Sequence, residues 1–179
     1  MTLPEGERIA YATAEPEERY RLASCTFAKT RIAERIVERH RGEPTLVIGQ
    51  YLDQLDELAD HLKAPVIKGS TPVKEREQLF DGFRAGEIDL LVVSKVANFS
   101  VDLPEAAVAI QVSGSFGSRQ EEAQRLGRLL RPKAAGGTAH FYTLVSRDTV
   151  DADFAQNRQR FLAEQGYAYR IVDAEDLPA

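Results

Sequence analysis

The stretch SRQEEAQRLGRLLRPK, residues 118–133, is the segment around which the rest of the chain is organised. Ser118 followed by Glu121 is a capping-box pair, so the pattern predicts a helix that begins at Ser118 and ends before Pro132. On both sides of this helix, short apolar runs alternate with amphipathic stretches. That alternation is typical of βαβ crossovers and predicts an α/β domain with a mostly parallel sheet.

One face of the predicted helix carries Gln124, Arg128 and Arg131, which lie at i, i+4 and i+7. Gly127 stands in mid-helix, where it costs about 1 kcal/mol relative to alanine and indicates the close approach of another surface. Two arginines one turn apart suit a triphosphate, because each planar guanidinium can bind phosphate oxygens in two-point contact. The spacing alone is equally compatible with an amphipathic surface helix whose arginines are solvated.

The order of elements follows from apolar runs and helical spacing. Helices are predicted at residues 17–41, 52–62, 71–84 and 148–165, besides the arginine-bearing helix. Strands are predicted at residues 45–48, 65–67, 88–93, 108–112, 139–145 and 167–172. The first 15 or so residues show little pattern, so residues 1–20 are interpreted as a tail or linker and residues 21–179 as the domain.

In parallel sheets, ligands gather at the carboxyl ends of the strands. Ser94 and Lys95 follow the third predicted strand, where a hydroxyl, a backbone amide and a point charge suit a nucleic-acid phosphate. Asp102, further along the same segment, could accept a hydrogen bond from a ribose hydroxyl. The alternative is a surface loop in which Asp102 is an ordinary turn residue ahead of Pro104.

Composition excludes several classes of protein. The 179 residues are 43% hydrophobic with a formal net charge of -5, so any nucleic-acid contact must be local rather than through bulk charge. Cys25 is the single cysteine and the three histidines lack metal-ligand spacing, so neither a disulfide nor a metal site is predicted. No signal peptide or long apolar stretch is present in the sequence, which predicts a cytoplasmic protein without a membrane partner, associated with the nucleoid when on DNA.

The run Q-x-x-G-R-x-x-R at residues 124–131 resembles the last signature motif of superfamily 2 helicases, and the wider string GSRQEEAQRLGRLLRPK resembles the XPB/Rad25 branch of DNA helicases. The resemblance extends over nearly everything after about residue 20. It implies a three-layer RecA-like domain, the second of the two that bind ATP between them. It also implies an ATP-dependent DNA helicase or translocase with a role in DNA repair.

For the nucleotide, the resemblance implies that Arg128 and Arg131 are catalytic arginine fingers for the γ-phosphate. Gln124 and Gly127 would line the same cleft, and Asp102 would contact the nucleotide from a segment resembling the family's motif V.

For DNA, the resemblance implies backbone contacts by Ser94 and Lys95 in motif V and by Gly49 and Gln50 in motif IV. The motif V segment departs from the family pattern at residues 97–99, where Ala-Asn-Phe replaces the usual Gly-Asp-Thr. This departure leaves an alternative open, in which the chain is an orphan RecA-like module that binds DNA or a protein without ATPase activity.

The chain contains no G-x-x-x-x-G-K-[S/T] phosphate loop and no acidic pair for magnesium. The resemblance therefore assigns ATP and Mg²⁺ mainly to an N-terminal helicase domain, joined in cis or in trans, and this chain alone is expected to be inactive. An unrelated α/β phosphoesterase is a further alternative, although no nucleophile or paired-carboxylate signature supports it.

Overall fold

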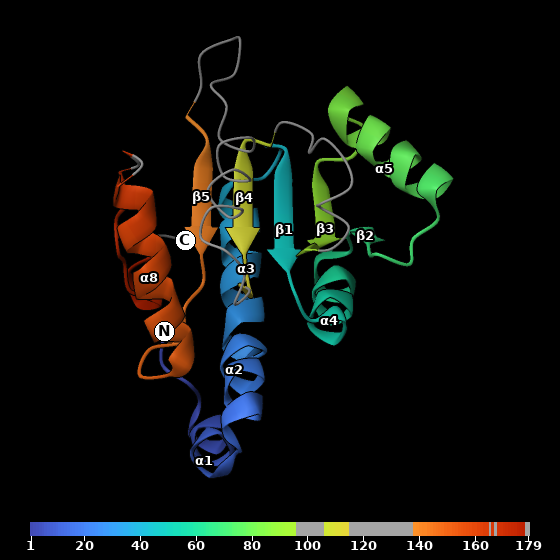
Figure 1. Cartoon of the computed structure of the whole chain (residues 1–179). Coiled ribbons are helices and arrows are strands. Elements are labelled where there is room, and N and C mark those ends of the chain that lie inside the picture. The colour runs from blue at the N-terminus through green and yellow to red at the C-terminus, as the bar shows by residue number, and fades with distance from the viewer. Residues whose placement is uncertain (96–105, 115–137, 165, 167, 178–179) are drawn as a thin grey trace.

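A computed structural model describes residues 1–95, 106–114, 138–164, 166 and 168–177. Its described strands form one parallel sheet in the order β2-β3-β1-β4-β5 (Figure 1). The strands are β1 (Thr45–Gly49), β2 (Val66–Ile67), β3 (Leu90–Ser94), β4 (Val108–Gln111) and β5 (His140–Thr143). The helices are α1 (Glu5–Thr13), α2 (Pro16–Ser24), α3 (Phe27–Arg39), α4 (Leu52–Leu62), α5 (Val73–Ala85) and α8 (Val150–Glu164), followed by the 3₁₀ turn η1 (Ala174–Asp176).

Alternate side chains of each central strand enter two separate cores. Val47 of β1 joins one core with residues of α3 and α4. Its neighbours Leu46 and Ile48 join the other core, which contains Phe80 and Phe83 of α5. Helices therefore cover both faces of the sheet, and the predicted three-layer α/β architecture with a parallel sheet is confirmed.

Most predicted element positions agree with the structure to within a few residues, but the first long helix does not. Residues 17–41 form two helices, because Cys25 and Thr26 leave the helical conformation. Thr26 has an extended backbone (φ -60°, ψ 136°), and its hydroxyl accepts a 3.3 Å hydrogen bond from the backbone N–H of Ala28. A side chain that caps a new helix competes with continuation of the old one, so the single predicted helix was wrong.

The two ends of the chain also differ from their predicted local structure. Helix α1 occupies the stretch predicted to be irregular, and Leu3 and Tyr20 are buried at 5% and 1% exposure. The proposed domain boundary at residue 20 stays a prediction. At the other end, the strand predicted at residues 167–172 is absent over the described residues 168–172. Arg35 of α3 instead bonds to the carbonyl oxygens of Ala174 and Leu177, which holds the end of the chain against that helix.

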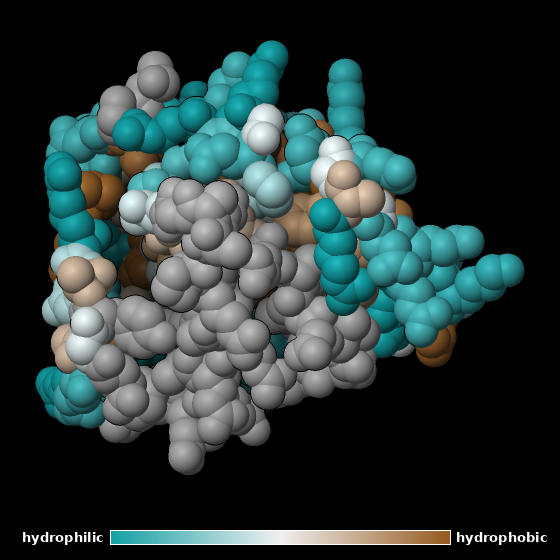
Figure 2. All heavy atoms as spheres, turned by 90° about the horizontal axis from the view of Figure 1, so that it is seen from above, coloured by the Kyte–Doolittle hydropathy of each residue, from teal (hydrophilic) through white to brown (hydrophobic). Residues whose placement is uncertain are grey.

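Seen from the amino ends of the strands, the visible described surface is mostly hydrophilic (Figure 2). None of the helices in the described ranges combines the length and the apolar character that a membrane crossing requires. The arginine-bearing helix predicted at residues 118–132 lies outside the described residues.

Candidate functional site

The carboxyl ends of the strands meet along one edge of the sheet, where α2 and α4 also lie (Figure 1). Gly49 at the end of β1 pairs with Ser94 at the end of β3, and Ile48 pairs with Gln111 at the end of β4. The sheet therefore brings together the four residues predicted to contact DNA, because Gln50 and Lys95 directly follow that Gly49–Ser94 pair.

Gly49 occupies a crowded position, where a larger residue would force neighbouring side chains to shift. A Cβ atom there would lie 2.9 Å from Leu55 Cδ2, 3.0 Å from Ser113 Oγ and 3.0 Å from Val112 Cγ2. The close approach lets the segment after β1 pack directly on the segment after β4. The backbone N–H of Gln50 then donates a 2.7 Å hydrogen bond to the Ser113 hydroxyl.

The four predicted DNA-contacting residues differ in accessibility. Gly49 is buried and Ser94 is 2% exposed, whereas Gln50 and Lys95 are half-buried. The backbone N–H of Gln50 is already used within the protein, so the contact it can offer to a phosphate is through its side chain. Gln50 and Lys95 are therefore the members of the set whose side chains reach the surface.

The segment that leaves β4 is held at three consecutive residues. Lys29 Nζ of α3 donates a 2.9 Å hydrogen bond to the Val112 carbonyl, and Tyr20 OH of α2 donates a 2.8 Å hydrogen bond to the Gly114 carbonyl. Between them lies Ser113, which accepts the hydrogen bond from the Gln50 backbone. This segment leads directly into residues 115–133 of the sequence, and the three contacts fix its path at residues 112–114.

Lys29 is neutralised by a buried ion pair. Its ammonium lies 2.8 Å from Asp151 Oδ2 of α8, and the two side chains are 0% and 1% exposed. The same carboxylate oxygen accepts a 2.9 Å hydrogen bond from the Ser146 backbone N–H. Burial lowers the pKa of Lys29, and the negative charge of Asp151 opposes that shift. The ion pair links α3 to α8. Because Lys29 also bonds to Val112, directly after β4, the pair holds this segment in place.

Aromatic side chains line the same edge. Tyr20 lies edge-on to Phe154 with ring centroids 5.2 Å apart, and tilted to Tyr51 at 6.4 Å. Burial raises the pKa of Tyr20, and burial followed by the charge of Tyr20 raises the pKa of Tyr51 to about 12. Both phenols are therefore neutral hydrogen-bonding groups near pH 7.

Sequence reasoning missed Tyr20, Lys29 and Asp151. The sequence does indicate that Lys29 is buried. Lys29 lies three and seven residues before the buried Ile32 and Ile36, and thus on the apolar face of its helix. Nothing local identified its partner, which is 122 residues away in the chain.

The predicted nucleotide-binding and catalytic residues lie outside the described residues. They are Asp102, Gln124, Gly127, Arg128 and Arg131. Over the described ranges, no group of three or more His, Cys, Asp or Glu side chains is arranged to hold a metal ion.

Two histidines that are far apart in sequence do meet. The rings of His40 and His140 lie 5.1 Å apart, and hydrogen bonds of 2.8 Å join His40 to Glu43 and to Tyr142 OH. These contacts use both ring nitrogens of His40, so the cluster ties the end of α3 to β5.

The parallel sheet and its helices define a RecA-like domain of the kind found in helicases. The C-terminal domain of the DEAD-box protein Dbp5 has the same fold, with a TM-score of 0.64 at 15% identity over 76% of this chain and 79% of that chain. Residues 8–177 match the family described as ERCC3/RAD25/XPB C-terminal helicase. The chain belongs to this family.

Relatives of the family match nearly the whole chain. The DNA 3'-5' helicase XPB of Kineococcus radiotolerans is 72% identical over 177 residues, which are 99% of this chain and 32% of that protein. The general transcription and DNA repair factor IIH helicase/translocase subunit XPB of Drosophila melanogaster is 40% identical over 169 residues, 90% of this chain and 21% of that protein. The chain thus spans about a third or less of the length of these relatives.

Proposed function

We propose that this chain is the second RecA-like domain of an ATP-dependent DNA 3'-5' helicase or translocase. The observation that carries the proposal is the 72% identity over 99% of the chain to a protein named as a DNA 3'-5' helicase, of which it spans the equivalent of one domain. The absence of a phosphate-loop motif from the sequence fits a domain that completes an ATP site rather than one that holds ATP alone.

In the proposed motor, ATP lies between this domain and a first RecA-like domain that holds the phosphates and Mg²⁺. Arg128 and Arg131 would approach the γ-phosphate and offset the charge that builds in the transition state of hydrolysis. Gln124, Gly127 and Asp102 would line the nucleotide cleft. The anchoring of Val112, Ser113 and Gly114 supports this arrangement, since it fixes the start of the segment that carries both arginines.

The proposed DNA contacts lie at the carboxyl ends of β1 and β3. Lys95 would offer its ammonium and Gln50 its side-chain amide to backbone phosphates, while the buried Gly49 and Ser94 would set the positions of these neighbours. Such contacts carry no sequence preference, so the domain would follow the DNA backbone. Closing and opening of the cleft would move these contacts along the strand and convert hydrolysis into translocation.

We extend the proposal to a role in DNA repair. The Drosophila relative is named as a subunit of a transcription and DNA repair factor. Repair proteins are therefore the proposed partners, in addition to DNA and the first motor domain.

The test is ATP hydrolysis with and without forked DNA, by this chain alone and by the chain fused to the part of the Kineococcus relative that the match leaves uncovered. We expect activity only in the fusion, and we expect DNA to stimulate it. Arg131→Ala should lower the hydrolysis rate of the fusion by about 10³ or more, the usual effect of losing an arginine finger. Arg160→Ala, on the exposed face of α8, is the matched control and should leave the rate unchanged.

Equal activity of the Arg131→Ala fusion would contradict the finger assignment. An inactive fusion, together with DNA binding by the chain that Lys95→Ala weakens and the exposed Lys74→Ala does not, would favour the orphan DNA-binding module instead.

A further inference from the structure

The outer edge of β5 is an open strand edge. In the described sheet β5 is the terminal strand, and the backbone N–H groups of His140 and Leu144 donate 2.9 Å hydrogen bonds to carbonyls in and beside β4. Because successive residues of a strand point their backbone groups to opposite sides, those of Phe141 and Thr143 point away from β4. Within the described parts of the chain, no hydrogen bond reaches these outward groups. They are free to pair with another strand.

The residues that follow β5 already pair in this way with Met1. Met1 donates a 3.3 Å hydrogen bond from its terminal ammonium to the Val145 carbonyl, and its own carbonyl accepts a 2.7 Å hydrogen bond from the Arg147 N–H. These two bonds have the pattern of a parallel β-bridge. The edge can therefore bind an extended segment, and Thr143 and Phe141 are the next positions along it.

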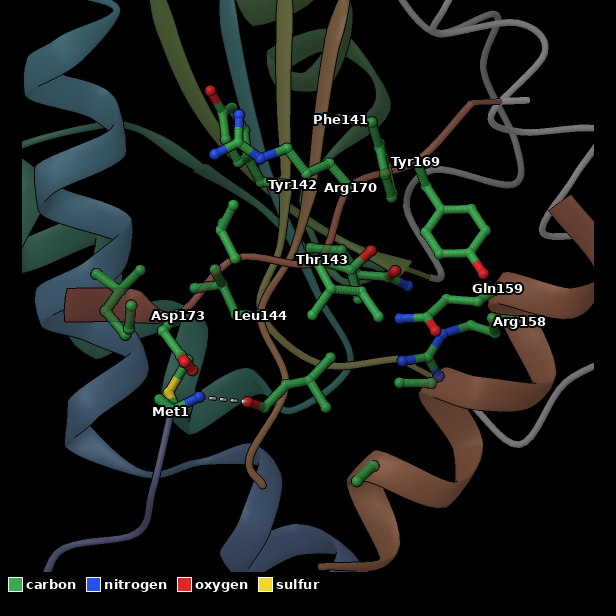
Figure 3. A pocket seen from close by; sticks show the side chains of 18 of the residues that line it. Met1, Phe141, Tyr142, Thr143, Leu144, Arg158, Gln159, Tyr169, Arg170 and Asp173 are labelled. Carbon is green, nitrogen blue, oxygen red and sulfur yellow. Dashed lines mark hydrogen bonds between the residues drawn. The ribbon is translucent and has the colours of Figure 1, made fainter. Parts of the chain in front are cut away.

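A cavity of about 350 Å³ lies along this edge. Residues 141–145 form one wall, α3 and α8 contribute Ile32, Ile36 and Ala155, and residues 169–174 close the far side (Figure 3). Tyr169, Ile171 and Val172 are 54%, 72% and 40% exposed beside it. Apolar side chains left exposed around a hollow are typical of a binding surface.

The charged groups around the cavity are mainly positive. Arg147, Arg158 and Arg170 line it, and Asp173 is the one carboxylate among its lining residues. Asp173 is ion-paired with Arg147. An occupant with carboxylates would be attracted to this rim, and an occupant with lysines would be repelled.

We propose that the outer edge of β5 binds an extended acidic segment of a partner protein as a sixth strand of the sheet. Apolar side chains of that segment would fill the cavity, and its carboxylates would face the exposed Arg170. The outward N–H and C=O groups of Phe141 and Thr143 would supply the backbone hydrogen bonds. This is β-strand addition, in which backbone pairing provides affinity and alternate side chains provide specificity. Such binding does not depend on ATP hydrolysis.

The test uses the 179-residue chain and a labelled synthetic peptide of about eight residues that alternates valine and glutamate, a typical strand length. Fluorescence anisotropy should show binding that weakens at high salt, and a valine–lysine peptide should not bind. Thr143→Pro removes the outward N–H and should weaken binding by about tenfold, the value of one hydrogen bond. Arg170→Glu should weaken it further. Arg84→Glu, at a half-exposed position on the distant helix α5, is the matched charge control.

Amide hydrogen exchange tests the proposal independently if the Thr143→Pro variant folds poorly. In the wild-type chain the amide hydrogens of Phe141 and Thr143 should exchange quickly, and the bound valine–glutamate peptide should slow them by about tenfold or more. Absence of binding, or equal affinity of a folded Thr143→Pro variant, would overturn the proposal. So would slow exchange at Thr143 in the free chain that truncation after residue 167 abolishes, because the chain's own C-terminal segment would then be the occupant.

Discussion

The carboxyl end of β4 and the outer edge of β5 are neighbouring parts of one sheet with opposite hydrogen-bonding states. After β4, Val112, Ser113 and Gly114 are each held by a different element, through Lys29, the Gln50 backbone and Tyr20. Along β5, the outward groups of Phe141 and Thr143 have no hydrogen bond in the described chain.

The segment after β4 is therefore held in one conformation, whereas the outer edge of β5 can still form hydrogen bonds. Buried backbone groups that are already satisfied give a segment one conformation, which suits the start of a segment proposed to place arginines at a γ-phosphate. Backbone groups of β5 that have no partner in the described chain keep their capacity to bind, so the same sheet can be rigid at one place and able to bind a further strand at the next.

The strongest test of the fixed region is Lys29→Met. It leaves the Asp151 carboxylate buried without its cation, so we expect a loss of about 3–5 kcal/mol in the free energy of unfolding, measured by urea denaturation. The double variant Lys29→Met/Asp151→Leu should recover a large part of that loss, since both charges are then gone. Lys74→Met, at an exposed position of α5, should change little. A single variant as stable as the wild type would show that the pair does not support this region.

The next largest effect is expected at Gly49. Gly49→Ala places a Cβ within 3.0 Å of Leu55 and of the Val112–Ser113 segment, and should cost about 1–3 kcal/mol through overpacking. Gly6→Ala in α1 meets nothing within 4 Å and should stabilise slightly, because alanine favours the helix. Thermal unfolding of the two variants compares a crowded glycine with an open one, and similar midpoints would contradict the close packing of β1 against β4.

Tyr20→Phe removes one hydroxyl from the fixed region. The Gly114 carbonyl loses its 2.8 Å hydrogen bond inside the protein, which should cost about 1 kcal/mol in unfolding experiments near pH 7.

The same variant has a defined pH dependence. Because burial raises the pKa of Tyr20, the unfolded chain releases this proton at a lower pH than the folded chain does. The tyrosine contribution is therefore fully present below about pH 10, the ordinary tyrosine pKa, and is lost as the pH rises beyond it. The stability difference between wild type and Tyr20→Phe should shrink above that pH, and a difference that grows instead would contradict the burial of this phenol.

The smallest effect is expected at the open edge. Thr143→Pro removes no hydrogen bond of the described sheet, so its unfolding free energy should stay within about 1 kcal/mol of the wild type. Val92→Pro in the interior strand β3 is the contrasting variant and should prevent stable folding, because it breaks the ladder of a buried strand. A severe loss in Thr143→Pro would show that the outward groups of β5 are already engaged.

Local patterns in the sequence were enough to predict the layered α/β fold. The apolar run at residues 45–48 became β1, the spacing of leucines at residues 52–62 became α4, and Gly86 ends α5 in the left-handed conformation with φ 76°. Each of these outcomes depends on residues that lie within a few positions of one another, so the sequence contains the whole physical cause. The family resemblance was noticed from a motif that is contiguous in sequence, and the family match over residues 8–177 confirmed it.

Tertiary structure alone decided which polar groups meet. Lys29 bonds to Asp151 across 122 positions and Tyr20 bonds to Gly114 across 94. The described residues 168–172 form no strand, and Arg35 of α3 bonds to Ala174 and Leu177 beyond them. The energy of these contacts comes from burial and from satisfying hydrogen bonds between distant elements, which no local pattern encodes. For this protein the sequence by itself determined the five described strands, most of the helices and the family, whereas packing of the elements decided which residues support the carboxyl-end site and which strand edge stays open.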